Sequence, residues 1–242
     1  METPEDKPVI GTLNEGSLHS AMKILYTEPG DQLEVPIDGY VVDIWRNTQK
    51  ENVIIEIQTS SFGSMRKKLE SLLQNYKIKV VYPIAIETQL RKSGNKLRKS
   101  PKKGSIYNIF NELVSITGLL KEPNLSFEVV LTTVTKIQEY DPKLRRNRGG
   151  YRTVNTELKE VHSTQHFHGI KDFTRLLPSD LPNVFTTADI AESAQVTRQI
   201  AQQMAYCFRK TNIIEEVGST RLGKEYKSVS YTHLTLPTIC SV

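Results

Sequence analysis

The chain has 242 residues, of which 38% are hydrophobic and 24% are charged. This composition is typical of a globular protein with an apolar core, and the length allows one large domain or two small ones. The sequence lacks a run of about 18 apolar residues and a signal-peptide pattern, so we expect neither a membrane span nor secretion. The two cysteines, Cys207 and Cys240, cannot form a disulfide framework, and a reducing cytoplasm is the expected location.

The net charge of +5 is concentrated in two basic segments. Residues 91–103 (RKSGNKLRKSPKK) hold seven Lys and Arg and no acid, and without them the net charge is −2. Residues 143–152 (KLRRNRGGYR) hold five more. Such segments on a nearly neutral body suit a phosphate backbone, although solvated loops are the alternative. The nucleic-acid contacts expected here are Arg91, Lys92, Lys96, Arg98, Lys99, Lys102, Lys103, Arg145, Arg146 and Arg148.

Hydrophobic spacing predicts an α/β domain over residues 1–140. Residues 13–26 are expected to form a helix with Leu18, Ala21, Met22 and Leu25 on one face. The elements expected next are a strand at 32–37, a tight turn at Asp38-Gly39, a hairpin from 41 to 60, a helix at 64–76, a strand at 77–86, a helix at 105–120 and a long strand or strand pair at 125–140. This order predicts a mixed sheet flanked by helices.

The C-terminal part of the sequence predicts a second, smaller domain. Residues 141–168 are expected to be a basic linker, followed by a short helix at 169–177. Two helices at 187–193 and 196–211 and a hairpin at 213–227 complete a winged-helix pattern, so we expect such a domain over residues 169–228. The final residues, 229–242, resemble translated adaptor sequence, and we expect them to be non-native.

The second of these C-terminal helices carries side chains that suit DNA. Arg198, Gln202 and Arg209 lie opposite its apolar face, and Arg and Gln can hydrogen-bond to base edges in the major groove. The alternative is that the domain mediates protein contacts.

Polar residues interrupt the predicted hairpin VVDIWRNTQKENVIIEIQTS. With the turn centred between Gln49 and Lys50, Asp43 lies opposite Glu56, and opposed Cβ atoms are about 4.5–5.5 Å apart. Gln58 projects from the same face as Glu56. Two buried carboxylates repel each other, and a divalent cation with oxygen ligands, Mg²⁺ or Mn²⁺, would relieve that repulsion. Acids at strand ends in water, or paired with Arg66 or Lys68, are the alternative.

A third acid, Glu15, falls on the apolar face of the first predicted helix, within 60° of Leu18 at 100° per residue. An acid on a core-facing stripe needs a partner. Alternatively, Glu15 is an N-terminal acid favoured by the helix dipole, with Asn14 as the cap.

The ordered set of Glu15, Asp43 and Glu56-Ile57-Gln58 resembles the PD-(D/E)XK nuclease superfamily, in particular its Holliday-junction-resolvase branch. More narrowly, NEGSLHSAMK, PGDQLEVPIDGYVVDI, IIEIQTSSF, KSPKKG and TTADIA…QQMAYC resemble a prokaryotic nuclease-like group with a C-terminal winged helix. The likeness covers nearly all of residues 13–227.

The resemblance implies a metal-dependent DNA endonuclease in which Asp43 and Glu56 bind Mg²⁺. The Ile57 carbonyl would be a further ligand, and Glu15 would complete the shell or position a second ion. Gln58 occupies the position of the superfamily's usual lysine. Some active members carry Gln there, and in others the lysine has moved to the following helix, where Lys68 is the candidate; a solvated Lys68 is the alternative.

The departure at Gln58 keeps a second function open, namely a catalytically impaired protein that acts as a DNA-binding or regulatory module. A third is an interaction protein, for which DNA affinity would be weak and insensitive to salt. A homodimer would suit the cleavage of two strands, although no sequence pattern identifies a dimer interface.

Overall fold

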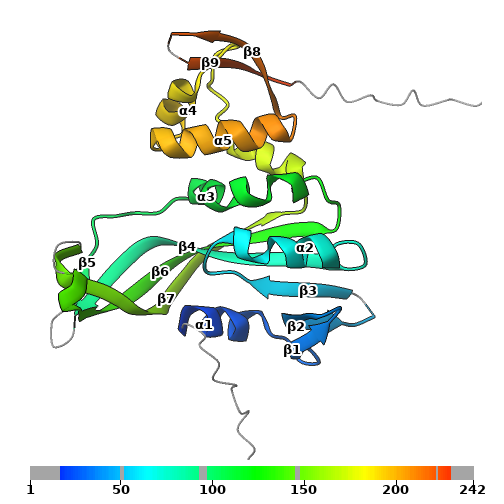
Figure 1. Cartoon of the computed structure of the whole chain (residues 1–242), viewed down its shortest axis with the longest axis vertical. Coiled ribbons are helices and arrows are strands. Elements are labelled where there is room, and N and C mark those ends of the chain that lie inside the picture. Colours follow the sequence, from blue (N-terminus) through cyan, green and yellow to red (C-terminus); the bar gives the residue numbers. More distant parts are fainter. Residues whose placement is uncertain (1–16, 50–51, 93–96, 145–147, 222, 230–242) are drawn as a thin grey trace, which may run out of the picture.

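The computed structural model in Figure 1 describes residues 17–49, 52–92, 97–144, 148–221 and 223–229. It is a mixed α/β structure built on a large sheet flanked by helices, as the sequence predicts. The strands of the sheet are β1 (Gln32–Ile37), β2 (Tyr40–Asn47), β3 (Asn52–Ile57), β4 (Lys77–Lys92), β5 (Arg98–Lys99), β6 (Leu125–Tyr140) and β7 (Tyr151–Phe167). The helices are α1 (Ser17–Tyr26), α2 (Arg66–Leu72), α3 (Phe110–Leu113), α4 (Thr187–Ser193) and α5 (Arg198–Lys210), and β8 (Ile214–Thr220) and β9 (Gly223–Ser228) form a separate hairpin.

The sheet has the order β1-β2-β3-β4-β6-β7, with β5 paired to β4. Strands β3, β4 and β6 are parallel, and the remaining pairs are antiparallel. The segments that contain α2 and α3 connect the parallel strands and cover one face, while α1 lies against the other (Figure 1). The central strands therefore read as nearly continuous apolar runs, because parallel strands are buried on both faces.

The register of the β2–β3 hairpin agrees with the prediction. Ile44 pairs with Ile55 and Trp45 with Ile54, which extends in register to Asp43 opposite Glu56. Ile44 and Ile55 are fully buried, and a shift by one residue would move every side chain of β3 to the other face of the sheet.

Helix α1 is rotated relative to its predicted apolar face. Leu25 was expected in the core but is 54% exposed, whereas Met22 and Lys23 are buried. The buried stripe also includes the half-buried Leu18 and Tyr26. The prediction for Leu25 is wrong because Lys23 is buried in ion pairs with Glu34 and Asp43, which turns Leu25 toward solvent.

The predicted helix at residues 105–120 is largely irregular. Only α3 is α-helical, and it is flanked by the 3-10 helices η2 (Ile106–Ile109) and η3 (Val114–Leu119), the latter kinked at Ile116. Strand β4 is longer than predicted, since it runs to Lys92 and not to residue 86. Residues 125–140 form one strand.

The linker predicted at residues 141–168 is wrong for most of its length, because Tyr151–Phe167 form β7 along the edge of the sheet. Most side chains of this strand are exposed or half-buried, so its sequence lacks the apolar alternation of a strand with one buried face. Charged and hydroxyl-bearing residues on a long edge strand also discourage pairing with other chains.

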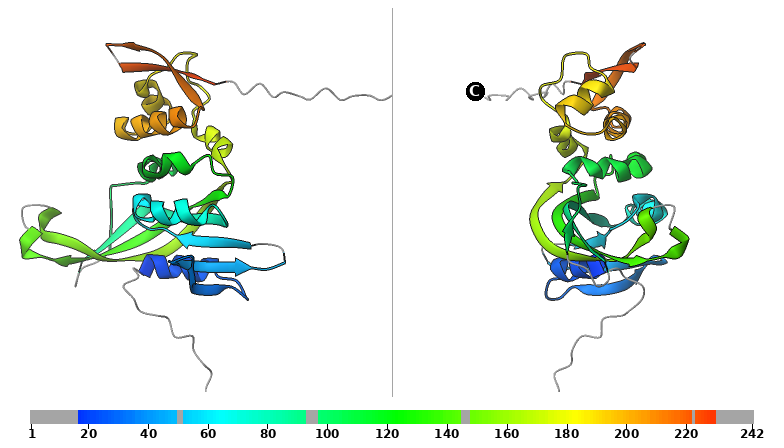
Figure 2. Two further views of the ribbon diagram at one scale, coloured as in Figure 1. Left: turned by 45° about the vertical axis from the view of Figure 1, so that its right-hand side comes forward. Right: turned by 90° about the vertical axis from the view of Figure 1, so that its left-hand side faces the viewer.

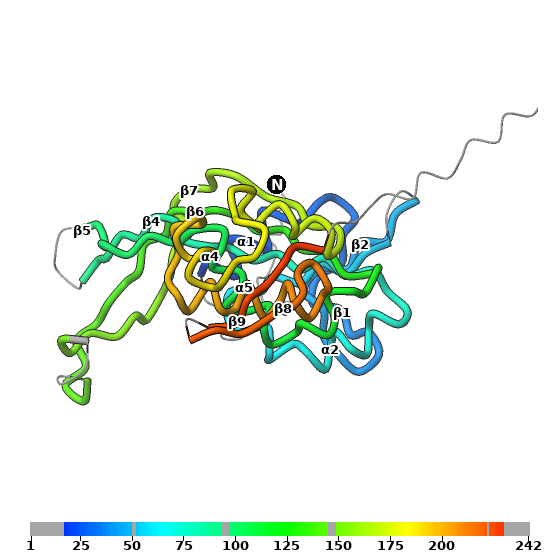
Figure 3. The backbone as a smooth tube through the Cα atoms, turned by 90° about the horizontal axis from the view of Figure 1, so that it is seen from above, coloured from blue at the N-terminus to red at the C-terminus, as the bar shows by residue number. Residues whose placement is uncertain are grey.

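Beyond the end of β3 the longer strands form a projecting arm, which we define as β5, β4 from Glu87, β6 from Thr133 and β7 up to Leu158. Figure 2 shows the arm extending from one side of the body. Seen from above in Figure 3, the β4–β5 end and the β6–β7 end point apart. The described parts of both predicted basic segments therefore lie on the same side of the molecule.

The C-terminal elements match the prediction closely. Helix α4 has the predicted bounds, α5 lies within its predicted range, and the β8–β9 hairpin extends one residue beyond its own, to Ser228. A capping box begins α4: the Thr186 hydroxyl accepts from backbone N–H groups, and Asp189 accepts from the Thr186 N–H. The segment at 169–177 contains the 3-10 helix η6 (Ile170–Leu176).

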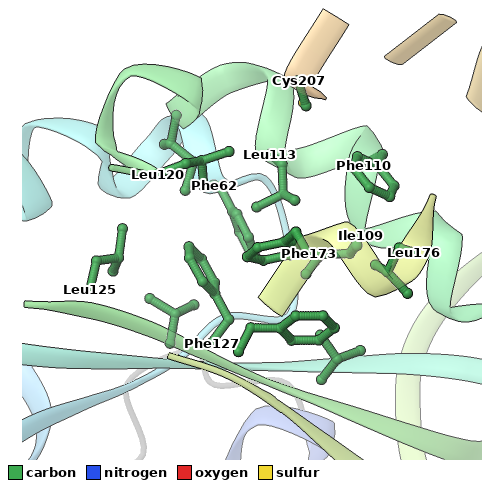
Figure 4. Packing of buried hydrophobic residues seen from close by; sticks show 14 of the residues in the cluster. Phe62, Ile109, Phe110, Leu113, Leu120, Leu125, Phe127, Phe173, Leu176 and Cys207 are labelled. Carbon is green, nitrogen blue, oxygen red and sulfur yellow. The ribbon is translucent and has the colours of Figure 1, made fainter. Parts of the chain in front are cut away.

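One continuous hydrophobic core joins these C-terminal elements to the sheet. Phe208 of α5 packs edge-to-face on Phe110 with ring centroids 5.2 Å apart, and Cys207 Sγ lies 3.9 Å from Thr117 Oγ1. Figure 4 shows this core rising from Phe127 on the sheet past Leu113 to Cys207. No helix in the described part of the chain is long and apolar enough to span a membrane.

Because the core is continuous, Phe208→Ala should destabilise the N-terminal part as well, by about 3–5 kcal/mol. Trp45 on β2 is the chain's single tryptophan, so its fluorescence in urea reports on the sheet. Tyr206→Ala, at a 40% exposed position on the same helix, is the matched control and should change the free energy of unfolding by less than about 0.5 kcal/mol. An unchanged Trp45 transition in Phe208→Ala would mean that the two parts unfold independently.

Candidate functional site

Asp43 and Glu56 lie together at the end of β3, where the β2–β3 register brings them opposite each other. Asp43 Oδ2 accepts a hydrogen bond of 2.8 Å from the Ile57 N–H. The side chain of Glu56 is only 8% exposed. The structure thus brings together two of the predicted metal ligands. Ile57, the last residue of β3, lies next to both of them.

Lys68 reaches this pair from α2. Its Nζ is 2.6 Å from Glu56 Oε1 and donates to the Val41 carbonyl at 2.6 Å. The lysine lies beside the buried Leu69 of α2, and its side chain is only 15% exposed. It is therefore not the solvated lysine of the alternative interpretation. Arg66 pairs with Glu70 and takes no part in the site.

Two residues of α1 that the sequence patterns did not identify also belong to the site. His19 Nε2 is 3.4 Å from Asp43 Oδ2, and Lys23 Nζ is 3.5 Å from Asp43 Oδ1. Lys23 also pairs with Glu34 of β1. The available signal was their spacing of four residues, which puts both on one flank of the apolar stripe.

Arg46 fixes α1 against β2 and so holds His19 and Lys23 beside Asp43. Its guanidinium forms a bidentate pair with Asp31 at 3.0 and 2.8 Å. It also donates to the Tyr26 carbonyl at the end of α1 and lies 2.9 Å from Glu28. A planar guanidinium suits this combination of a carboxylate and a helix C-terminus.

The two acids are electrostatically unequal. Burial raises the pKa of Glu56 to about 7, and the charge of Asp43 adds to the rise, while Lys68 limits it. Burial also opposes ionisation of Asp43, but hydrogen bonds from His19 and the Ile57 N–H, with the charges of His19 and Lys23, lower its pKa below the usual value. Near neutral pH, Asp43 is ionised and Glu56 is close to its midpoint.

Gln58 lies beside the acids, but its amide is engaged elsewhere. Nε2 donates to the Ser61 carbonyl at 2.7 Å and to Ser64 Oγ at 3.1 Å. Gln58 therefore secures the turn into α2, and no contact joins it to either acid among the described hydrogen bonds.

A cleft of about 490 Å³ opens over the site, lined by both acids, His19, Gln58 and Lys68. A larger cavity of about 790 Å³ lies at the opposite ends of the parallel strands, beside Asn52, Lys77 and Asn124. We place the candidate site in the smaller cleft because the unequal pair of acids and the buried lysine face it.

The donor set fits a divalent cation only in part. Carboxylate oxygens suit Mg²⁺ or Mn²⁺. However, the described residues contain no group of three or more His, Cys, Asp or Glu side chains that could hold a metal ion. Glu15, the third predicted acid, lies outside the described residues.

The arm holds the predicted basic contacts, several of which already have partners. Arg91 pairs with Glu157 at 2.9 Å, Lys99 pairs with Glu87 at 2.8 Å, and Lys92 lies over the Tyr151 ring. Arg98, Lys102 and Lys103 are exposed. Lys96, Arg145 and Arg146 lie outside the described residues, and of Arg148 only its backbone, in the 3-10 helix η5 (Arg148–Gly150), is described.

On α5, Arg198 and Gln202 are exposed, as predicted for side chains that contact DNA. Gln202 lines a groove of about 340 Å³ together with Val114 of η3. Arg209 is instead 3.5 Å from Glu216 of β8.

The fold and site define an α/β protein with an acid–lysine cleft at the end of a mixed sheet. Residues 16–168 match a family described as Domain of unknown function (DUF8091), and the chain belongs to this family. It is 32% identical over 189 residues to an uncharacterized protein of Treponema pallidum (strain Nichols). The aligned region covers 76% of this chain and 74% of that protein. No solved structure matches significantly. The family match ends next to the end of β7 and so includes the edge strand.

The raised pKa of Glu56 makes stability depend on pH. The ordinary pKa of this carboxyl is 4.5, and in the folded protein it is about 7. Between these two pH values the folded protein binds more protons than the unfolded chain, so the free energy of unfolding falls as pH rises. At 1.36 kcal/mol per pKa unit, the loss is roughly 3 kcal/mol. Glu56→Gln should abolish it, so that its stability relative to wild type increases from pH 5 to pH 8 in urea titrations with EDTA.

Glu70→Gln, an exposed acid on α2, is the control and should follow wild type at every pH. Asp43 acts in a different interval, because its lowered pKa removes stability only as pH falls below its ordinary 3.8. A constant difference between Glu56→Gln and wild type across pH 5–8 would contradict the assignment.

Proposed function

We propose that the protein is a metal-dependent DNA endonuclease of the PD-(D/E)XK superfamily. The observation that carries the proposal is the meeting of Asp43, Glu56 and Lys68 in one cleft at the end of β3. These residues come from two strands and the helix that follows them, in the chain order of the motif that the sequence resembles. The sheet with α2 between parallel strands supports the same superfamily.

In this proposal each residue of the cleft has a separate role. Asp43, which is ionised near neutral pH, and Glu56 hold the cation, with the Ile57 carbonyl and Glu15 as further ligands. The chemistry that Mg²⁺ would supply there is a bound water of lowered pKa and polarisation of the scissile phosphate. Lys68 supplies the positive charge that Gln58 cannot, beside the position where charge develops on the phosphate.

His19 and Lys23 fit this scheme as residues that position Asp43 and keep it ionised. Their contacts and the Ile57 N–H fix both oxygens of its carboxylate. A carboxylate held in one orientation needs less rearrangement when it binds a cation.

The same site also supports the alternative of a catalytically impaired DNA-binding module. Gln58 is committed to the turn before α2, and Lys68 already neutralises part of the charge of Glu56. If the acids serve only as structural ion pairs, DNA binding would survive without cleavage.

For DNA binding we propose a winged-helix module formed by α4, α5 and the β8–β9 hairpin, acting with the basic arm. The exposed Arg198 and Gln202 on α5 support the module. The exposed Arg98 of the arm, together with the exposed Lys102 and Lys103 that follow β5, supports contacts with the phosphate backbone.

The nuclease proposal is tested with the full chain on supercoiled, flapped and branched DNA in Mg²⁺, Mn²⁺ or EDTA. We expect cleavage with either metal and none in EDTA. Asp43→Asn and Glu56→Gln should each lower the rate by about a hundredfold or more, and Lys68→Ala by a comparable factor, because each removes charge at the reacting phosphate.

Glu70→Gln should cleave at the wild-type rate. Metal binding is followed separately by thermal stabilisation, which should be larger at pH 8 than at pH 6, because a proton on Glu56 competes with the cation. DNA binding without metal-dependent cleavage on any of these substrates would favour the impaired module.

The winged-helix proposal predicts distinct effects for the side chains of α5. Arg198→Ala should weaken duplex binding and reduce the slope of log affinity against log salt by about 1. Gln202→Ala should leave the slope unchanged. Arg209→Ala should have a smaller effect than Arg198→Ala, since Glu216 already neutralises Arg209. Equal slopes for wild type and Arg198→Ala in fluorescence-anisotropy titrations would exclude a phosphate contact at Arg198.

A further inference from the structure

The β6–β7 end of the arm presents an exposed aromatic side chain. Tyr140 closes β6 opposite Tyr151, the first residue of β7, and is 55% exposed. Its ring meets that of Tyr151 edge-to-face, with centroids 5.7 Å apart and planes inclined by 72°. A large ring this exposed at the end of an arm gains little from burial in the core and is open to a partner on its free face.

The Tyr140 ring packs over Gly150. Gly150 has a φ of +78°, which favours glycine, and a Cβ atom at this position would lie 2.6 Å from Tyr140 Cε2. The Asp141 N–H donates to the Gly150 carbonyl at 2.7 Å, so the backbone that carries the ring is hydrogen-bonded across the two strands.

One cation contacts the tyrosine pair and others lie near it in the chain. Lys92 Nζ lies 3.5 Å from the centroid of the Tyr151 ring, while Arg152 is 3.9 Å from Glu139, its cross-strand neighbour. Lys143 is exposed in the turn that follows Tyr140. Aromatic rings interleaved with basic side chains are how proteins bind single-stranded nucleic acid, since bases stack on the rings while cations follow the phosphates.

The tyrosine pair also lies on a route that begins at the acid cleft. His19 lines both that cleft and a cavity of about 220 Å³ bordered by Thr59 and by Thr153 and Thr156 of the β7 part of the arm. From Val81, which pairs with Ile57 at the end of β3, β4 continues to Lys92. At about 3.3 Å per residue this is roughly 35 Å, a span of several nucleotides.

We propose that Tyr140 and Tyr151 form a stacking site for an unpaired base of DNA, so that the substrate is DNA with a single-stranded segment lying along the arm. This inference rests on the proposed function and names its substrate class. A paired base offers no free face to the ring, so the site discriminates unpaired DNA from a continuous duplex.

The test measures binding in EDTA, where no cleavage occurs, with a flapped DNA carrying 2-aminopurine at one unpaired position and a fully paired duplex of equal length. We expect Tyr140→Ala to lose at least fivefold in affinity for the flapped DNA, which is about 1 kcal/mol at 1.4 kcal/mol per tenfold. Its affinity for the duplex should change less than twofold. The change in 2-aminopurine emission seen with wild type should be absent.

Tyr140→Phe keeps the ring and should bind both DNAs as wild type does. Lys143→Ala removes a charge beside the pair and should weaken both DNAs equally, with a shallower salt dependence. Thermal midpoints should stay unchanged in all three variants, because both side chains are exposed.

Equal effects of Tyr140→Ala on the two DNAs, or no effect on either, would overturn the stacking site. If wild type and Tyr140→Ala then cleave flapped DNA alike in Mg²⁺, the proposed function stands without it. If wild type binds neither DNA and cleaves neither, both proposals fail.

Discussion

The antiparallel register of β2 and β3 is the constraint on which the candidate site depends. Burial of Ile44 against Ile55 leaves one alignment in which both faces are satisfied, and that alignment sets Asp43 opposite Glu56. The two carboxylates are therefore held next to each other in a site with little access to water. The surrounding cations of α1 and α2 are arranged around this repulsion, and they resolve it unequally: three groups hold Asp43 ionised, whereas Lys68 and burial leave Glu56 near its midpoint.

Sequence patterns predict the parts of this arrangement that rest on local periodicity. The hairpin register and the bounds of α4 follow from apolar spacing, whereas Lys68 was named from the resemblance to the nuclease superfamily. His19 and Lys23 were missed because α1 is oriented by tertiary contacts: Arg46 binds its C-terminal end, and Lys23 is buried where Leu25 was expected. The strand β7 was missed because an edge strand with two largely exposed faces carries no apolar alternation.

Arg46 shows how a structural contact can act on chemistry at a distance. It touches neither acid, yet its bonds to Asp31 and the Tyr26 carbonyl set the rotation of α1. That rotation places His19 on Asp43 and also on the cavity that leads to the arm. One buried guanidinium thus connects the electrostatics of the cleft with the shape of the surface beside it.

The core that joins α5 to α3 has a consequence for geometry. A module attached by a flexible tether can pivot, so the distance between what it grips and what its neighbour touches varies from one encounter to the next. Here Phe208 and Cys207 are locked against Phe110 and Thr117, and the exposed side of α5 keeps a constant bearing toward the cleft at the end of β3. A molecule that contacts both surfaces must therefore match the distance and angle between them, so its length and curvature decide whether it fits.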